Sequence, residues 1–192
     1  MTKKIKTREL AIASGLAAVS AVVQLIHIGY ISPQWGMWID IVAVTWAIAL
    51  LLFGLRISFI VSLIGAIIIT FVDPSTWLGA GMKWLASFPV LLMLGLWLIN
   101  NKKPLTYYHK ISHLIATVVL GILIRCLIVI PVNYYYAIPI WTKMTPAQAM
   151  TAIPWYIIAL FNIVQTILEI GLAWILVYKF RLNRYASSQK QE

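Results

Sequence analysis

Charged side chains are scarce in this sequence. Of its 192 residues only 10% are charged and only five are acidic, whereas 62% are hydrophobic. A water-soluble domain of this length has too little interior to bury that much apolar surface. The composition is instead typical of a chain whose solvent is a lipid bilayer.

The sequence also lacks the motifs of several enzyme classes. Its single cysteine, Cys126, excludes an internal disulfide bond and a metal site built from several cysteines. His109 and His113 are one helical turn apart, but no third ligand accompanies them, so no metal site is predicted. No GxxxxGKS/T phosphate loop, HExxH pair or GxSxG nucleophile motif is present. We therefore predict neither an enzyme nor a bound cofactor.

Long apolar runs are what the sequence does contain. A membrane-spanning helix needs about 20 mostly apolar residues. Six candidate segments cover roughly residues 9–28, 37–54, 57–72, 82–100, 111–136 and 152–178. No linker or internal repeat separates them, so we predict an all-α integral membrane protein with one six-helix domain across residues 1–192.

The basic residues, which give the chain a net charge of +10, group on one side of this six-helix arrangement. Twelve of the fifteen precede the first segment, follow the last one, or lie in the second-to-third and fourth-to-fifth connections: Lys3, Lys4, Lys6, Arg8, Arg56, Lys102, Lys103, Lys110, Lys179, Arg181, Arg184 and Lys190. By the positive-inside rule, both termini are cytoplasmic in a multi-pass protein of the cell membrane. Topology therefore explains the charge, and no nucleic-acid partner is predicted.

The connections predicted on the outer side are rich in proline, glycine and aromatic residues. The densest cluster is NYYYAIPIW at residues 133–141, where proline restricts the backbone and aromatic rings offer flat apolar faces. We predict that Tyr134, Tyr136 and Trp141, with Tyr135 beside them, line or cover a pocket that opens outward. Ordinary aromatic residues at the membrane surface are the alternative.

Polar side chains within or at the ends of the apolar segments are the candidate ligand-binding groups. Such groups are costly at membrane depth, so they normally face the bundle interior or a water-filled cavity. The candidates lie at the starts of the second and fourth segments, in the fifth, and on one face of the sixth: Asp40, Lys83, Arg125, Asn133, Asn162 and Gln165. At about 1.5 Å per helical residue, Asn162 lies roughly 15 Å below the outer end of its helix, and Arg125 lies roughly 12 Å below Asn133. These depths are compatible with one site in the outer half of the membrane.

A structural role is the alternative for each of these residues. Asn162 and Gln165 could form hydrogen bonds that hold helices together. Arg125 could pair with Glu169, one turn beyond Gln165, although the two groups differ in depth. The charged residues that start the second and fourth helices could likewise pair with each other.

The first segment carries a stripe of small side chains. Ala13, Ala17 and Ala21 are four residues apart, so they share one helix face. A stripe of this kind lets another helix approach closely. That helix could belong to this chain or to another membrane protein.

Four stretches together resemble a known family. They are ELAIASGLAAVSAVV at residues 9–23, GMWIDIVAV with the following FG, NYYYAIPIW, and LFN in the sixth segment. In order and spacing, these stretches resemble the substrate-binding S components of energy-coupling-factor (ECF) vitamin transporters, most nearly the riboflavin-specific branch. The resemblance implies a six-helix protein that captures a vitamin from outside and works with a membrane coupling subunit and two cytoplasmic ATPases.

The resemblance also assigns roles to individual residues. Asn133 and Asn162 match ligand-binding asparagines, and Ala13 and Ala17 match the face that docks the coupling subunit. Gln165 stands where the riboflavin branch has a lysine, and SLIGAIIIT replaces the polar residues of its third helix. The alternatives to a riboflavin carrier are an S component for another vitamin, a membrane scaffold protein without a small-molecule ligand and, ranked third, a membrane enzyme.

Overall fold

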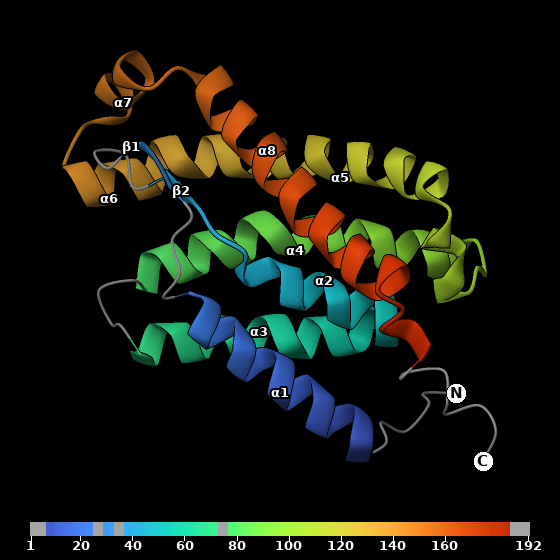
Figure 1. Cartoon of the computed structure of the whole chain (residues 1–192). Helices are drawn as coiled ribbons and strands as arrows, with labels where there is room; N and C mark the ends of the chain where they lie inside the picture. Colours follow the sequence, from blue (N-terminus) through green and yellow to red (C-terminus); the bar gives the residue numbers. More distant parts are fainter. Residues whose placement is uncertain (1–6, 25–28, 33–36, 73–76, 185–192) are drawn as a thin grey trace.

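The computed structural model describes residues 7–24, 29–32, 37–72 and 77–184. Almost all of them are helical (Figure 1). The principal α-helices are α1 (Thr7–Val23), α2 (Val42–Phe53), α3 (Leu55–Val72), α4 (Trp77–Asn100), α5 (Ile111–Val132) and α8 (Trp155–Trp174). The shorter elements are β1 (Gly29–Ser32), β2 (Met37–Ile39), the 3-10 turn η3 (Leu105–His109), the π turns η4 (Asn133–Ala137) and η5 (Ile175–Lys179), and the helices α6 (Ile138–Thr142) and α7 (Pro146–Ala152).

Each predicted apolar segment corresponds to one principal helix, but several boundaries differ. The first helix ends at Val23, and residues 25–28 of that segment lie outside the described residues. The second segment begins with β2, which pairs antiparallel with β1, and its helix starts only at Val42. The all-α prediction did not include this hairpin. Its aromatic and β-branched residues favour an extended backbone.

Three helical stretches among the described residues are long and apolar enough to cross a membrane. They are Trp77–Asn100, Ile111–Thr142 and Trp155–Lys179. The other three apolar helices, Glu9–Val23, Val42–Phe53 and Leu55–Phe71, are shorter. The presence of membrane helices is therefore supported, whereas six complete spans and the cytoplasmic location of the termini stay predictions.

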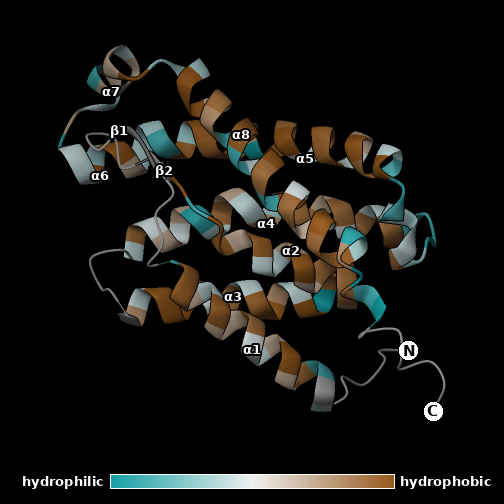
Figure 2. Ribbon diagram, viewed as in Figure 1, coloured by the Kyte–Doolittle hydropathy of each residue, from teal (hydrophilic) through white to brown (hydrophobic). Residues whose placement is uncertain are grey.

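The principal helices run back and forth between two ends of the molecule (Figure 1). We call one of them the basic end. There α1 begins, α2 joins α3, α4 joins α5, and η5 ends, so this end carries Arg56, Lys102, Lys103, Lys110 and Lys179. The hydrophilic colour at this end contrasts with the hydrophobic colour along the helices (Figure 2).

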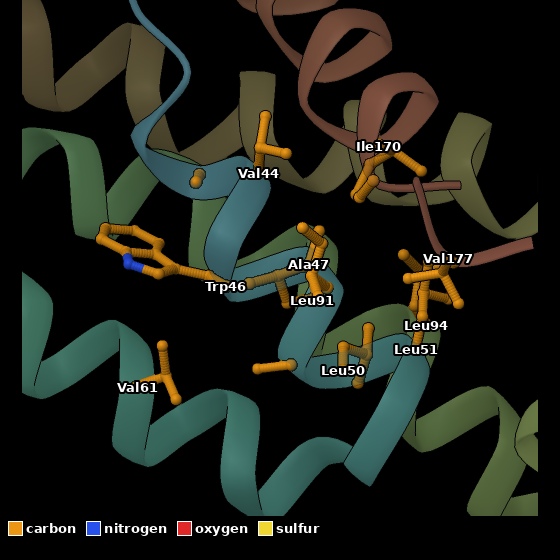
Figure 3. Packing of buried hydrophobic residues seen from close by; sticks show 14 of the residues in the cluster. Val44, Trp46, Ala47, Leu50, Leu51, Val61, Leu91, Leu94, Ile170 and Val177 are labelled. Atoms are coloured by element: carbon orange, nitrogen blue, oxygen red, sulfur yellow. The ribbon is translucent and has the colours of Figure 1, made fainter. Parts of the chain in front are cut away.

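Helix α2 forms the centre of the core. Ten of its 12 residues are buried, because α1, α3, α4 and α8 surround it. Trp46 and Leu50 are fully buried, and they belong to one apolar cluster with Val61, Leu91 and Ile170 of neighbouring helices (Figure 3). A helix that is apolar all round is expected at such a central position.

Two glycines set the close geometry of this core. Gly54 joins α2 directly to α3 with a φ of 90°, a backbone conformation that residues other than glycine rarely adopt. Gly95 of α4 faces Leu55 so closely that an added Cβ would lie 2.8 Å from the Leu55 Cβ. Helices α3 and α4 can therefore pack tightly only because residue 95 has no side chain.

The NYYYAIPIW stretch does not end its helix. Pro131 and Pro139 each lack the N–H that an α-helix needs, and the π turn η4 lies between them. The Ile138 N–H donates to the Asn133 carbonyl instead of to a carbonyl four residues back. The helical stretch consequently continues to Thr142, six residues beyond the predicted boundary.

Candidate functional site

Four charged side chains, three of them buried and Lys83 partly exposed, meet where α8 passes α4, α5 and the start of α2. We call Asp40, Lys83, Arg125 and Glu169 the charge network. Lys83 Nζ lies 2.8 Å from Asp40 Oδ1 and 2.5 Å from Glu169 Oε1. Arg125 Nη1 lies 3.1 Å from Glu169 Oε2. The exposed fractions of Arg125 and Glu169 are 1% and 2%, so these two charges are shielded from solvent.

The charge network is electrically balanced, with two cations and two anions. It uses two of the five acidic residues in the sequence. A buried charge without a partner costs several kcal/mol, so removal of any one of the four would leave an uncompensated charge in the core. Glu169 is the hub, because its two carboxylate oxygens accept from Lys83, Arg125 and also Ser87, whose Oγ is 3.2 Å from each oxygen.

The polar face of α8 surrounds this hub. Positions 162, 165, 166 and 169 are three and four residues apart, so their side chains share one face. Asn162 Oδ1 accepts from Arg125 Nε at 2.7 Å, and Thr166 Oγ1 accepts from Arg125 Nη1 at 3.0 Å. The guanidinium is thus held in one orientation by three side chains of α8.

Gln165 connects α8 to the start of α2 and leaves one atom unused. Its Nε2 donates to the Asp40 backbone carbonyl at 2.7 Å and to Glu169 Oε1 at 2.9 Å. Among the described residues, Gln165 Oε1 is the one buried side-chain oxygen or nitrogen without a hydrogen-bond partner. An unsatisfied buried acceptor costs about 1–3 kcal/mol, so a donor group that reached it would be bound favourably.

Five of the predicted binding residues are therefore brought together: Asp40, Lys83, Arg125, Asn162 and Gln165. Asn133 lies apart, eight residues or about 12 Å further along the helical stretch from Arg125. It is buried, and its Nδ2 donates to the Val129 carbonyl at 2.9 Å.

The aromatic residues of η4 and α6 divide into two groups. Tyr134 is buried, and its hydroxyl donates to the Ile153 carbonyl at 2.6 Å, which ties η4 to the connection between α7 and α8. Tyr135, Tyr136 and Trp141 are exposed by 59%, 63% and 41%. These three rings lie at the surface of the chain, apart from the charge network.

Comparison with known proteins identifies the family. The model of the family described as "ECF transporter, substrate-specific component" matches residues 8–179. The chain belongs to this family. The resemblance found in the sequence is thus confirmed at family level, whereas the riboflavin-specific branch stays a prediction.

A solved structure shares the fold of this chain. The chain is similar to a solved structure described as "Structure and mechanism of the S component of a bacterial ECF transporter", with a TM-score of 0.62 and 21% sequence identity. The similarity covers 96% of this chain and 98% of that chain. The search of curated proteins gave no match.

Helix α1 of this S component packs its alanine stripe inside the chain. Ala13 and Ala17 are exposed by only 2% and 1%, and Ala21 is half-buried. Ser20, on the same helix, forms a hydrogen bond with Thr45 of α2, with 2.5 Å between the two hydroxyl oxygens. The internal alternative thus accounts for Ala13 and Ala17 in this structure.

Two residues around the S component's charge network were absent from the sequence prediction, and one pairing was left open there. Ser87 lies four residues after Lys83, and Thr166 lies four residues after Asn162, so helical spacing could have indicated both. The sequence left the Arg125–Glu169 pair open, because the two residues were expected at different depths in the membrane. Helix α8 crosses α5 obliquely, which brings Glu169 within reach of the long arginine side chain (Figure 1).

Proposed function

We propose that this S component captures a vitamin from outside the cell, with riboflavin or a flavin relative as the first ligand to test. A membrane coupling subunit and two cytoplasmic ATPases would then drive its uptake. The observation that carries the proposal is the free acceptor of Gln165, buried beside the charge network in a protein of this family.

We place the entrance of the proposed site at the end opposite the basic end. Asp40 lies two residues before the start of α2, and Lys83 is in the second turn of α4; both helices run from that side toward the basic end (Figure 1). Asn133 and Tyr134 lie at the same end of α5. If the basic end is cytoplasmic, as the positive-inside rule predicts, these groups are reached from outside.

The charges limit what the ligand can present to this site. The charge network sums to zero, so a net charge on the buried part of a ligand would lack a counter-charge. The free acceptor of Gln165 calls for an N–H or O–H group. The flavin ring system meets both conditions, because it is uncharged and carries an N–H between two carbonyls. Other uncharged vitamins with a donor group meet them as well.

The docking of partners is proposed for α1. Since Ala13 and Ala17 are buried, the available small side chains are Ser14 and Ala18, which are exposed, with Ala21 at the edge of the same face. This face is free to lie against a helix of the coupling subunit.

A membrane scaffold is the competing function, because the same network could serve only to hold α4, α5 and α8 together. The two proposals are separated by purifying the protein from its native membrane, extracting any bound ligand and identifying that ligand by mass spectrometry. We expect a small organic ligand at close to one per chain, and a yellow protein if the ligand is a flavin. A ligand-free protein that also fails to bind any of a panel of uncharged vitamins in titration would favour the scaffold.

A further inference from the structure

A second candidate site lies at the basic end and shares no residue with the charge network. It is an open hollow of about 370 Å³ between η3, the start of α5 and the end of η5. Its wall contains two imidazoles, an ammonium and four neutral polar side chains: His109, His113, Lys110, Thr106, Tyr107, Tyr178 and Asn183.

No acidic side chain lies in the described wall of this hollow. The sequence has no aspartate or glutamate between Asp73 and Glu169, and Glu169 is engaged in the charge network. Lys103 adds a further cation, since its Nζ lies 5.6 Å from the centre of the Tyr107 ring, which also lines the hollow. The hollow therefore attracts anions.

Ring contacts hold the wall of the hollow in place. The Tyr107 and His113 rings stack with centroids 4.1 Å apart, and His113 Nδ1 lies 3.1 Å from the Tyr107 carbonyl oxygen. The His109 ring meets the Tyr178 ring edge to face at 5.5 Å. These contacts join η3 to α5 and to η5, so the hollow is part of the packed fold.

An apolar stripe begins at the same place and runs along α5. Ile111, Ile115, Val119, Leu123 and Leu127 are four residues apart, so they form a ridge that winds slowly around the helix, and their exposed fractions run from 51% to 76%. The stripe is about 24 Å long at 1.5 Å per residue, which suits an acyl chain. A free phosphate would use only the hollow, whereas a phospholipid would use both features.

We propose that this hollow binds the headgroup of an anionic phospholipid, with the acyl chains along the α5 stripe. Basic pockets between membrane helices bind such headgroups because phosphate and cationic side chains attract each other close to the low-dielectric bilayer. This inference does not depend on which vitamin the protein carries.

The test is a titration of the delipidated full-length protein in detergent with phosphatidylglycerol, followed by native mass spectrometry. Phosphatidylcholine, which has no net charge, is the reference lipid. We expect Lys110→Gln to weaken phosphatidylglycerol binding about fivefold, the effect of one basic side chain near an anionic surface, and Lys110→Glu to weaken it further. Lys143→Gln is the matched control, because Lys143 is exposed at the opposite end.

The result is interpreted only for variants that melt at the parent temperature. If the two Lys110 variants bind phosphatidylglycerol more weakly while their binding of phosphatidylcholine is unchanged, the site is supported. Equal loss in Lys143→Gln, or unchanged binding in Lys110→Glu, overturns it, because attraction would then be general or absent. Displacement of the lipid by equimolar inorganic phosphate would also overturn it, because the hollow would then bind free phosphate without help from the stripe.

Discussion

Arg125 of α5 and Glu169 of α8 form a buried ion pair, with Arg125 Nη1 3.1 Å from Glu169 Oε2. The two residues are 44 positions apart, and neither is more than 2% exposed. Glu169 also faces Lys83, so one carboxylate compensates cations from two different helices. This arrangement makes Glu169 the hub of the charge network.

Replacement of Glu169 by glutamine is expected to destabilise the protein by about 3–5 kcal/mol, because the buried Arg125 would lose the carboxylate it pairs with and the charge network would carry one excess positive charge. A lower melting temperature in detergent would show it. In the double variant Glu169→Gln/Lys83→Met one excess cation is removed, so its loss should be smaller than the sum of the single losses. Additive losses would mean that the pair contributes little, and Lys143→Met serves as the surface control.

The ligand proposal predicts that Asn162→Ala weakens binding about ten- to hundredfold, because a polar group of the ligand would lose its partner. Since Asn162 also orients Arg125, Thr166→Val is the matched variant that removes a different bond to the same guanidinium. Parent-like affinity for Asn162→Ala would place the pocket elsewhere. Asn133→Ala is expected to weaken binding by a similar factor.

Gln165→Lys restores the side chain that the resemblance assigns to the riboflavin branch. An ammonium at this position can donate to Glu169 and to the Asp40 carbonyl, the two acceptors that Gln165 Nε2 now serves. We expect riboflavin binding to be kept or improved, as measured by quenching of flavin fluorescence. If the variant stays folded and loses a ligand that the parent binds, the free Gln165 acceptor is what recognises that ligand.

The two faces of α1 predict opposite results for two neighbouring alanines. Ala17→Trp should destabilise the isolated protein, because residue 17 is only 1% exposed in the core. Ala18→Trp should leave its melting temperature and ligand binding unchanged, because residue 18 is exposed, but should reduce assembly with the coupling subunit. A stable Ala17→Trp protein that fails to assemble would instead assign docking to the Ala13/Ala17 face.

The orientation of the protein can be tested by cysteine labelling after Cys126 is replaced by alanine. Lys102 and Lys143 are exposed at the basic end and the opposite end, so Lys102→Cys and Lys143→Cys should react with an impermeant maleimide from opposite sides of the membrane. In intact cells we expect only Lys143→Cys to react. Labelling of both from one side would contradict the six-span topology. Ser75 and Ser187 are a second pair of positions at which introduced cysteines are expected to label from opposite sides, but both lie outside the described residues.

Tyr108 predicts a loss of stability at alkaline pH. Burial raises the pKa of its phenol from 10.0 to about 12, and its hydroxyl donates to the Leu94 carbonyl at 2.8 Å. Because the folded pKa lies above the unfolded one, this contribution is complete below about pH 10 and falls as the pH rises toward 12. Between pH 10 and 12 the melting temperature of Tyr108→Phe should fall less with rising pH than that of the parent. Tyr156→Phe, at an exposed position, is the control.

The sequence by itself determined the solvent, the helices and the family. Composition and apolar runs indicated a membrane protein, and each run became a helix, because the pattern of apolar residues is a local property. The polar residues within those runs were recognisable for a similar reason: each is costly at membrane depth wherever the helix lies. The family followed from short stretches whose order and spacing can be read along the chain.

Only the tertiary structure decided which of these residues meet. Spacing along α8 placed Asn162, Gln165 and Glu169 on one face, but not opposite Arg125, because that depends on the angle at which α8 crosses α5. The same holds for α1, where a stripe of alanines is equally suited to an internal or an external partner until burial is known. Contacts between distant segments follow from how whole helices pack, and a pattern that repeats every three or four residues does not by itself say which helix lies against which.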